Sequence, residues 1–161
     1  MTFKEWMINF IKESNTIENI HRGPTSEEIE EAWRFIELED IDIGEIIRFV
    51  SVYQPNAVLR DKKGLNVMVG NHLPPKGGPE IKKMLEDFLD CINGDPISDY
   101  TKNPFLAHKE YEALHPFTDC NGRSGRIIWL WQMRKLNKKF APMGFLQTWY
   151  YQSLDSKCSK I

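Results

Sequence analysis

The sequence predicts an all-α protein, a compact helical bundle that carries one β-hairpin. Two observations favour this class. Apolar residues recur at spacings of three and four over most of the chain, as in amphipathic helices. Only residues 56–75 depart from that period, with two short apolar runs around a turn-like tetrapeptide. The 161 residues suffice for one hydrophobic core, and no repeat or linker divides them, so we expect a single domain over residues 1–161.

Composition narrows the classes of function. A net charge of −2 argues against a general nucleic-acid binder. Cys91, Cys120 and Cys158 form no C-x-x-C pair, which predicts neither a disulfide framework nor a zinc site and favours a reducing, cytoplasmic setting. The first residues mix charges into the apolar positions, unlike a signal peptide or a membrane span. We therefore expect neither a nucleic-acid nor a membrane partner.

Three helices are expected before the hairpin. Residues 1–23 open with an amphipathic helix and end at Gly23-Pro24, a strong stop signal. Thr25 or Ser26 then caps a second helix, "TSEEIEEAWRFIELED", with acids in its first turn. The buried stripe of this helix is predicted to be Ile29, Trp33 and Ile36. The third helix lies in "DIGEIIRFVSVYQP" and ends at the proline.

The β-hairpin is predicted over residues 56–75. "AVLR" and "LNVMV" are its two strands, and "DKKG" is the turn between them. The charged residues at its tip are expected to be solvated or to contact a target: Arg60, Asp61, Lys62 and Lys63.

Helical periodicity returns after the hairpin. "PEIKKMLEDFLDCIN" has an apolar face made of Ile81, Met84, Leu85, Phe88, Leu89 and Ile92. "NPFLAHKEYEALH" forms the next helix, and "GRIIWLWQMRKLN" is apolar enough to be the central, most buried one. "PMGFLQTWYYQSL" predicts one last helix.

The stretch "HPFTDCNGRSGR" interrupts this helical pattern and carries the candidate chemistry. A loop that feeds a helix N-terminus presents unpaired N–H groups and the positive end of the helix dipole, which together favour phosphate. Gly122 lets a ligand approach the backbone, and Arg123 and Arg126 can bind phosphates through forked hydrogen bonds. Asp119 is a natural magnesium ligand, and His115 can accept a proton near neutral pH.

A plain helix–turn–helix corner is the alternative interpretation of this stretch. Asp119 would then be an N-cap, the two arginines would be solvated, and His115 would be a structural core histidine. The joint spacing H-P-F-x-D-x-N-G-R-x-x-R favours a nucleotide polyphosphate site over this corner.

This stretch resembles the signature of Fic-domain proteins, H-P-F-x-(D/E)-G-N-G-R-x-x-R, with Cys120 in place of the usual glycine. The resemblance extends over most of the chain and implies a Fic-like bundle whose catalytic helix–loop–helix covers residues 105–137. It implies that AMP is transferred from ATP to a serine, threonine or tyrosine hydroxyl of a target protein. The residues that it assigns to catalysis and nucleotide binding are His115 as general base, Phe117 as an anchor of the loop, Asp119 on Mg²⁺, Asn121 on the α-phosphate, Cys120 and Gly122 in the anion hole, and Arg123 and Arg126 on the β- and γ-phosphates.

The same resemblance assigns a role to the hairpin, which lies where the family carries its flap. The flap would hold a target segment by strand addition. Its docking residues are expected to be Val58, Leu59, Arg60, Val67 and Val69.

Cys120 leaves two questions open. If the loop needs a positive φ at this position, a residue with a Cβ is costly and can distort the anion hole. If it does not, a small thiol is tolerated. A nucleophilic role is the alternative to a spacer role, because a helix N-terminus lowers the pKa of a thiol.

A second pattern of the family, (S/T)-x-x-x-E-(G/N), matches Ser14, Glu18 and Asn19 and lies before the core, as in the subclass with N-terminal inhibition. It implies that Glu18 pairs with Arg126, fills the γ-phosphate site and inhibits the enzyme. A solvated Glu18 is the plain alternative. In some relatives the same glutamate helps to remove AMP, so Glu18 could also position a water.

Other functions remain open from the sequence. The same site could use another phosphate donor, or the chain could be a nucleotide-binding regulator with little catalysis. A DNA-binding module is weakly supported, because no helix has a basic face. Exposed aromatic residues leave a homodimer open.

Overall fold

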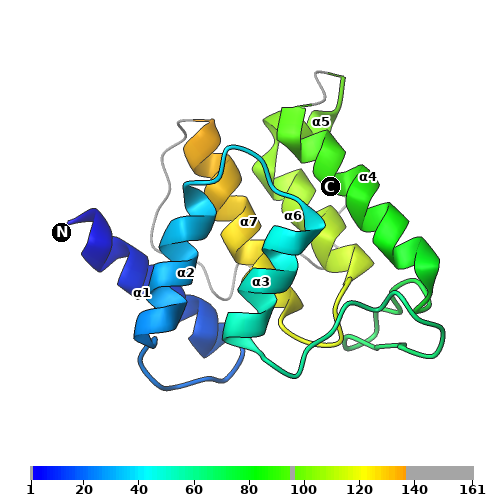
Figure 1. Cartoon of the computed structure of the whole chain (residues 1–161), viewed down its shortest axis with the longest axis horizontal. Helices are drawn as coiled ribbons and strands as arrows, with labels where there is room; N and C mark the ends of the chain where they lie inside the picture. The colour runs from blue at the N-terminus through cyan, green and yellow to red at the C-terminus, as the bar shows by residue number, and fades with distance from the viewer. Residues whose placement is uncertain (1, 95–96, 137–161) are drawn as a thin grey trace, which may run out of the picture.

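The all-α prediction is confirmed by the structure of the chain, a computed structural model that describes residues 2–94 and 97–136. The predicted helix in residues 142–154 lies outside these residues. Figure 1 shows the helices in chain order. Their bounds are α1 (Phe3–Ile17), α2 (Ser26–Ile36), α3 (Ile43–Tyr53), α4 (Pro79–Gly94), α5 (Asp99–Lys102), α6 (Pro104–Leu114) and α7 (Asn121–Lys135).

Local sequence signals explain where several helices begin. Thr2 and Thr25 form capping boxes with the glutamates three residues on, and Asp42 and Asn103 accept backbone N–H groups of the helices that they precede. The short α5 was not predicted, because four residues are too few to show a period.

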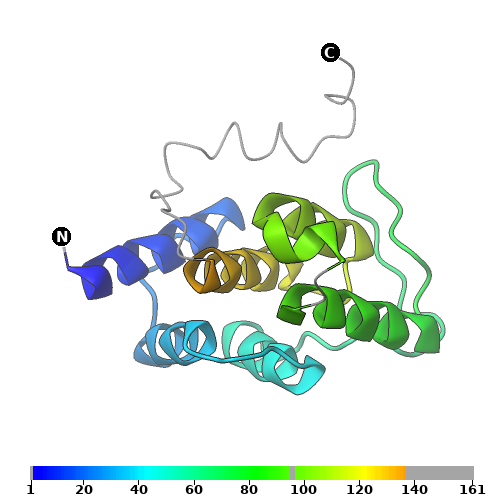
Figure 2. The same ribbon diagram turned by 90° about the horizontal axis from the view of Figure 1, so that it is seen from above.

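Helix α7 is the centre of the bundle. It contacts α1, α2 and α3 on one side and α6 on the other, with α4 and α5 packed on α6 (Figures 1 and 2). Its side chains are buried around most of its circumference, which explains why its sequence is apolar without a clear stripe. Trp131 is buried and donates its indole N–H to the Leu38 carbonyl at 2.9 Å. The prediction of a central helix is therefore correct.

The predicted stripe of α2 is wrong at Trp33, which is 39% exposed. The helix instead buries Ala32, Phe35 and Ile36. Glu28 and Glu31 share the inner face because arginines satisfy their carboxylates: Arg22 pairs with Glu28, and Arg34 and Arg48 pair with Glu31. On α4, only Met84 of the predicted face is exposed.

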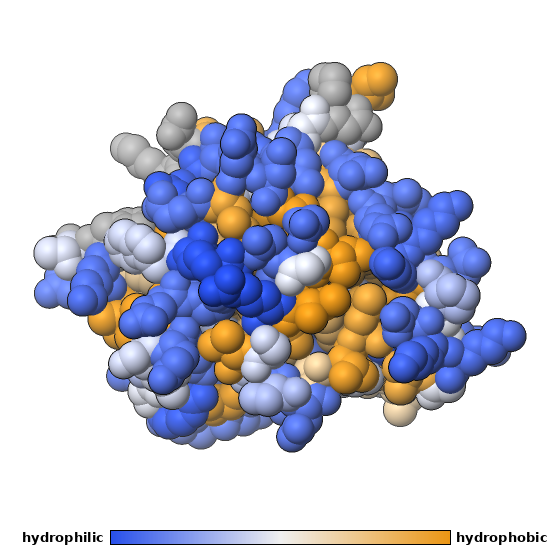
Figure 3. All heavy atoms as spheres, in the orientation of Figure 1, coloured by the Kyte–Doolittle hydropathy of each residue, from blue (hydrophilic) through white to orange (hydrophobic). Residues whose placement is uncertain are grey.

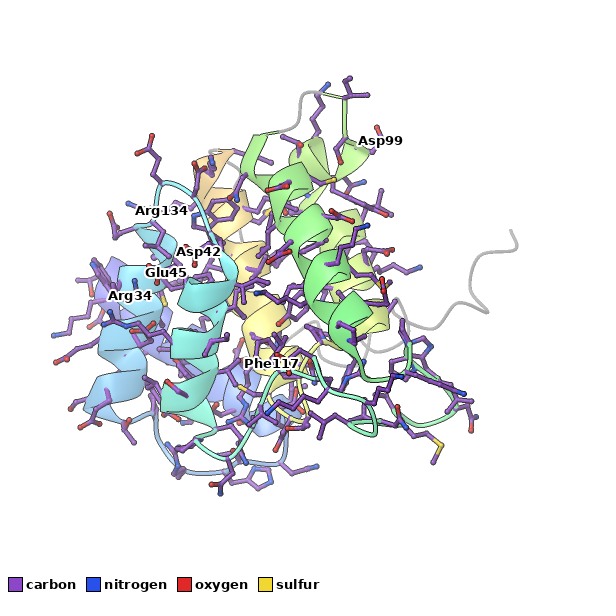
Figure 4. The ribbon with its side chains drawn as sticks, turned by 45° about the vertical axis from the view of Figure 1, so that its right-hand side comes forward. Arg34, Asp42, Glu45, Asp99, Phe117 and Arg134 are labelled. Atoms are coloured by element: carbon purple, nitrogen blue, oxygen red, sulfur yellow. The ribbon has the colours of Figure 1, made fainter. Side chains whose placement is uncertain are left out.

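Ion pairs also join α2 to α3. Arg34 on α2 bonds Glu45 on α3 at 2.5 Å, and Figure 4 labels both residues, together with Asp42 at the start of α3. Because the same guanidinium bonds Glu31, this pair fixes how the two helices lie against each other.

The β-hairpin prediction is wrong in its strand pairing. We call residues 56–75 the flap loop. Its two apolar runs do not pair with each other, and no strand forms among the described residues. One isolated bridge joins Val69 to His72 across a tight turn, and another joins Leu59 to Phe117. The first run therefore pairs with the α6–α7 loop, while the second projects from the bundle (Figure 2).

Apolar atoms lie between hydrophilic side chains on the face shown in Figure 3, over the region of α3 and α4 in Figure 1. Exposed apolar side chains of these helices and of the neighbouring flap loop are Ile47, Val58, Met68, Val69, Leu73 and Met84. None of the described helices has the length and apolar character needed to cross a membrane.

Candidate active site

The loop between α6 and α7 holds the candidate site and has two residues in left-handed conformation. His115 ends α6 with φ 50°, and Cys120 precedes α7 with φ 69°. Between them Phe117 is buried in the core, as the sequence predicted for an anchor; Figure 4 labels it where the loop meets the 54–60 segment. These conformations turn the chain sharply from the end of one buried helix to the start of the next.

Asn121 fixes the loop from inside. Its side-chain Oδ1 accepts the N–H of Phe117 at 2.9 Å, and its Nδ2 donates to the Phe117 carbonyl at 2.8 Å. The amide is buried and both of its polar atoms are engaged. The structure therefore gives Asn121 a role in holding the loop, and its contact with the α-phosphate remains a prediction.

Cys120 adopts the conformation that glycine would adopt more easily. Its positive φ means that the loop does require a left-handed residue here, and a Cβ in this region costs about 1–2 kcal/mol. The thiol is buried, and burial raises the pKa of Cys120 from 9.0 to about 12. Burial thus opposes the lowering of a thiol pKa that a helix N-terminus can give, which favours the spacer role of Cys120 over the nucleophilic one.

The left-handed conformation of Cys120 predicts that glycine is a more stable replacement than alanine, the reverse of the usual order. Cys120→Gly is expected to be more stable than Cys120→Ala by about 1 kcal/mol, because only glycine relieves the left-handed strain. At an ordinary position the alanine variant would be the more stable one. Thermal unfolding of both variants measures the difference, and a higher midpoint for the alanine variant would contradict the assigned strain.

The predicted anion site lies at the N-terminus of α7. The first intrahelical bond runs from Ser124 N–H to the Cys120 carbonyl at 2.9 Å, so the N–H groups of the preceding turn are not used within the helix. A Cβ at Gly122 would collide with Glu18 Oε1 and lie 2.9 Å from Arg126 Nη1. Gly122 thus leaves room for a carboxylate, or a phosphate, against the first turn of α7.

Asp119 is exposed beside this helix end. Its Oδ1 accepts the Cys120 N–H at 2.6 Å, while α7 itself has no side-chain N-cap, contrary to the helix–turn–helix alternative. No group of three or more potential ligands forms a metal site in the described part of the chain. A single carboxylate nevertheless fits Mg²⁺, which commonly takes one or two carboxylates and completes its shell with phosphate and water.

Arg126 is bound by the C-terminal end of α1. Its Nε donates to Ser14 Oγ at 2.8 Å, and its Nη2 donates to Glu18 Oε1 at 2.6 Å and to the Ser14 carbonyl at 3.0 Å. Arg126 is buried, whereas the Glu18 side chain is 37% exposed. The structure thus brings the two predicted partners together, although 108 residues separate them. Asn19 follows in left-handed conformation and ends the segment.

Arg123 does not converge with Arg126. Its Nη1 donates to the Tyr53 carbonyl at 3.0 Å and its Nη2 to Gln54 Oε1 at 3.4 Å, at the end of α3. Arg123 is buried there, so the two guanidinium groups contact different helices. The expectation that both reach one phosphate chain is not met by this arrangement.

His115 is half-buried at the edge of the site. Burial lowers the pKa of His115 below its ordinary value of 6.5, and the charges of Arg60 and His72 act in the same direction. Its Nδ1 lies 3.4 Å from the Glu112 carbonyl. The imidazole is therefore neutral at pH 7 and can accept a proton.

The sequence did not predict the buried positions of two polar residues in this region. Arg60, expected to be solvated or to dock a target, is fully buried beneath the α6–α7 loop. Glu112 has a buried Oε1 without a hydrogen-bond partner in the described structure. It lies 3.8 Å from Nε2 of His108, whose pKa burial lowers to about 3, and burial raises the pKa of Glu112 to about 7. No local signal distinguishes either residue from a surface charge.

Glu112 predicts a pH-dependent stability. Its pKa is raised from 4.5 in the folded state, so folding takes up a proton and stability falls as pH rises from about 4.5 to 7. Over this pH range the wild-type chain should lose roughly 3 kcal/mol of its free energy of unfolding, and the Glu112→Gln variant should not show this loss. Urea unfolding of both proteins at several pH values measures the change, with Glu80→Gln on the surface of α4 as control. A difference that is constant with pH would contradict the prediction.

Comparison with known proteins agrees with these features. The Fic/DOC family profile matches residues 15–133. A protein adenylyltransferase Fic of Drosophila erecta is 36% identical over an alignment of 66 residues that covers 38% of this chain and 13% of that relative. A probable protein adenylyltransferase of Aquifex aeolicus is 27% identical over 67 residues, 42% of this chain and 21% of that relative. The matches thus span a minor part of the length of each relative.

Proposed function

The chain belongs to the Fic/DOC family, and from this membership and the geometry of the α6–α7 loop we propose that it transfers AMP from ATP to a hydroxyl side chain of a target protein. The observation that carries the proposal is the arrangement of one motif. A neutral His115 stands at one end of the loop, and a helix N-terminus with Gly122 stands at the other. The relatives named adenylyltransferases support the choice of AMP transfer.

The mechanism follows from what each group can do. The phosphates of ATP bind against the N-terminus of α7, where the helix dipole and N–H groups favour negative charge. His115 takes the proton of the target hydroxyl, whose oxygen then attacks the α-phosphorus. A new bond forms between that oxygen and the α-phosphorus, the bond from the α-phosphorus to the bridging oxygen breaks, and pyrophosphate leaves. The catalytic contribution is mainly positioning and charge neutralisation.

Asp119 is the residue that would hold Mg²⁺, which would supply positive charge to the phosphates when bound. Its exposed carboxylate next to the start of α7 supports this assignment. Arg126 would bind the terminal phosphates once Ser14 and Glu18 release it. Arg123 would have to leave the carbonyl of Tyr53 to join it, so in the present arrangement it contributes only its charge.

Glu18 is proposed to inhibit this reaction. Its carboxylate bonds Arg126 and lies against Gly122, so it occupies the space that a terminal phosphate would need. A carboxylate and a phosphate would repel each other there, and ATP would bind in an unproductive pose. The inhibition acts in cis, from the end of α1.

The target segment is proposed to lie along the flap loop. Val58 and Val69 remain exposed, with Met68 and Leu73 beside Val69 in the chain, and they offer an apolar surface. Leu59 and Arg60 are not part of that surface, because Leu59 pairs with Phe117 and Arg60 is buried.

The test uses ATP labelled at the α- or the γ-phosphate. The full chain is incubated with each form, and covalent label on protein is measured. Label from the α-position alone is expected. Label from the γ-position would mean phosphate transfer and would refute the proposal, while binding of ATP without any transfer would favour a nucleotide-binding regulator.

A further inference from the structure

Arg60 is a buried cation whose hydrogen-bond acceptors are all main-chain carbonyls. Its side chain is completely inaccessible to solvent. Its guanidinium donates to the carbonyls of Leu114 at 2.9 Å, His115 at 2.7 Å, Pro75 at 2.8 Å and Leu65 at 3.2 Å. No carboxylate forms an ion pair with it in the described part of the chain. A buried charge without a counter-charge is costly, so its role has to lie in these four bonds.

Two of the four acceptors belong to the end of α6. Leu114 is the last residue of that helix and His115 is its C-cap, so their carbonyls lack partners within the helix and carry the negative end of its dipole. A guanidinium is well suited to bind such carbonyls. Arg60 thus caps α6 from a segment 55 residues away in the sequence.

The other two acceptors belong to the flap loop. Leu65 and Pro75 lie on opposite sides of its projecting part, and the same guanidinium joins both to the end of α6. The backbone continues this connection, because Arg60 N–H donates to the Pro116 carbonyl at 2.9 Å and Thr118 N–H donates to the Val58 carbonyl at 2.9 Å. The flap loop and the α6–α7 loop are therefore one hydrogen-bonded unit.

We propose that Arg60 is a positioning residue for His115, and that it couples the flap loop to the general base. Arg60 holds the carbonyl of His115, and the left-handed backbone of His115 sets the position of its side chain. The bonds to Leu65 and Pro75 tie this geometry to the loop on which a target would lie. The proposal rests on the proposed function, since it assigns Arg60 to the same reaction.

The charge of Arg60 also acts on His115. The groups that affect the titration of the imidazole are Arg60 and His72 from the flap loop, Glu18 from α1 and the Glu112 carbonyl from α6. Loss of the guanidinium removes one positive charge, which raises the pKa of His115 towards its ordinary value. A lysine would keep the charge but could not donate to four carbonyls from its single nitrogen.

Two variants, Arg60→Gln and Arg60→Lys, separate position from charge. They are made in the Glu18→Gly background, so that inhibition does not mask the rate. We expect Arg60→Gln to lower kcat about ten- to hundredfold with little change in the KM for ATP. The acid limb of its pH–rate profile should also move to higher pH. Arg60→Lys should lower kcat but leave the acid limb in place. Arg48→Gln, at an exposed arginine of α3, is the control.

The imidazole of His115 provides a readout that needs no activity. Its titration is followed by NMR in the otherwise wild-type chain and in both Arg60 variants, with the signal assigned by its loss in His115→Ala. A higher pKa in Arg60→Gln supports the proposal. Unchanged kcat in a folded Arg60→Gln protein, or an unchanged titration, would overturn it. Loss of the folded state in both variants would also overturn it, since Arg60 would then support the fold as a whole.

The two proposals fail in different ways. If neither the wild type nor Glu18→Gly transfers AMP, the proposed function is wrong, while the titration of His115 still decides whether Arg60 controls this imidazole. If AMP transfer occurs and Arg60→Gln leaves kcat and the titration unchanged, only the role of Arg60 is wrong.

Discussion

The Glu18→Gly variant is expected to transfer AMP about ten- to hundredfold faster than the wild-type chain. The wild-type carboxylate bonds Arg126 at 2.6 Å and lies against Gly122, at the place proposed for a terminal phosphate. Its removal takes away one acceptor of the buried Arg126 while the two bonds to Ser14 remain, and a phosphate can then bind the guanidinium in place of the carboxylate. Self-modification with ATP labelled at the α-phosphate measures the gain.

The chain offers a closely matched control for this experiment. Glu37 ends α2 as Glu18 ends α1, and it pairs with Arg134 of α7 at 2.6 Å. Glu37→Gly therefore removes a capping glutamate and an α7 ion pair away from the site, and it should leave transfer unchanged. Glu18→Gln keeps the side-chain length and removes the charge, so it should also activate. Equal rates for the wild type and both Glu18 variants would rule out inhibition by this carboxylate.

The second large effect is expected at His115. His115→Ala should reduce AMP transfer about 10²- to 10⁴-fold, because the target hydroxyl loses its proton acceptor. ATP should still bind, since the phosphates are proposed to lie at the N-terminus of α7. Single-turnover transfer in the Glu18→Gly background measures the rate, and equilibrium binding of ATP measures the affinity. His21→Ala, an exposed histidine, is the control.

The pH profile gives a further check of the role of His115. Only the neutral imidazole can act as base, so kcat/KM should fall as the pH drops through its pKa. Burial and the charge of Arg60 lower this pKa, which places the acid limb below pH 6.5. A limb above that value, or an alanine variant as active as the parent, would remove His115 from the role of general base.

Much of the fold could be predicted because its signals are local. Capping boxes at Thr2 and Thr25 and the acid at Asp42 act within one turn, and the helix periods follow from neighbours three and four residues apart. The hairpin prediction failed because the pairing of this segment is not local. Its first run pairs with Phe117 and Thr118, and no signal inside residues 56–75 reveals a partner so far along the chain.

The candidate site likewise has features that the sequence could predict and features that it could not. The motif from His115 to Arg126 is contiguous, so the sequence alone predicted a helix, a broken loop and a helix N-terminus with phosphate chemistry. Conformation within the motif depends on what surrounds it. The positive φ of Cys120 occurs in a loop that Asn121 closes onto Phe117, and Arg123 is turned towards the carbonyl of Tyr53 at the end of α3.

The helical class, the family resemblance and the residues that could carry AMP transfer were predictable without a structure, because each depends on residues close together in the chain. The resemblance implied that Glu18 pairs with Arg126, and the folded chain shows the bond across 108 positions. The burial of Arg60 against the His115 carbonyl appears in the folded chain alone. Hydrogen bonds between distant segments form only after the bundle has packed. A charged residue in a loop therefore looks solvated in the sequence, even when the fold buries it against main-chain carbonyls, as it does Arg60.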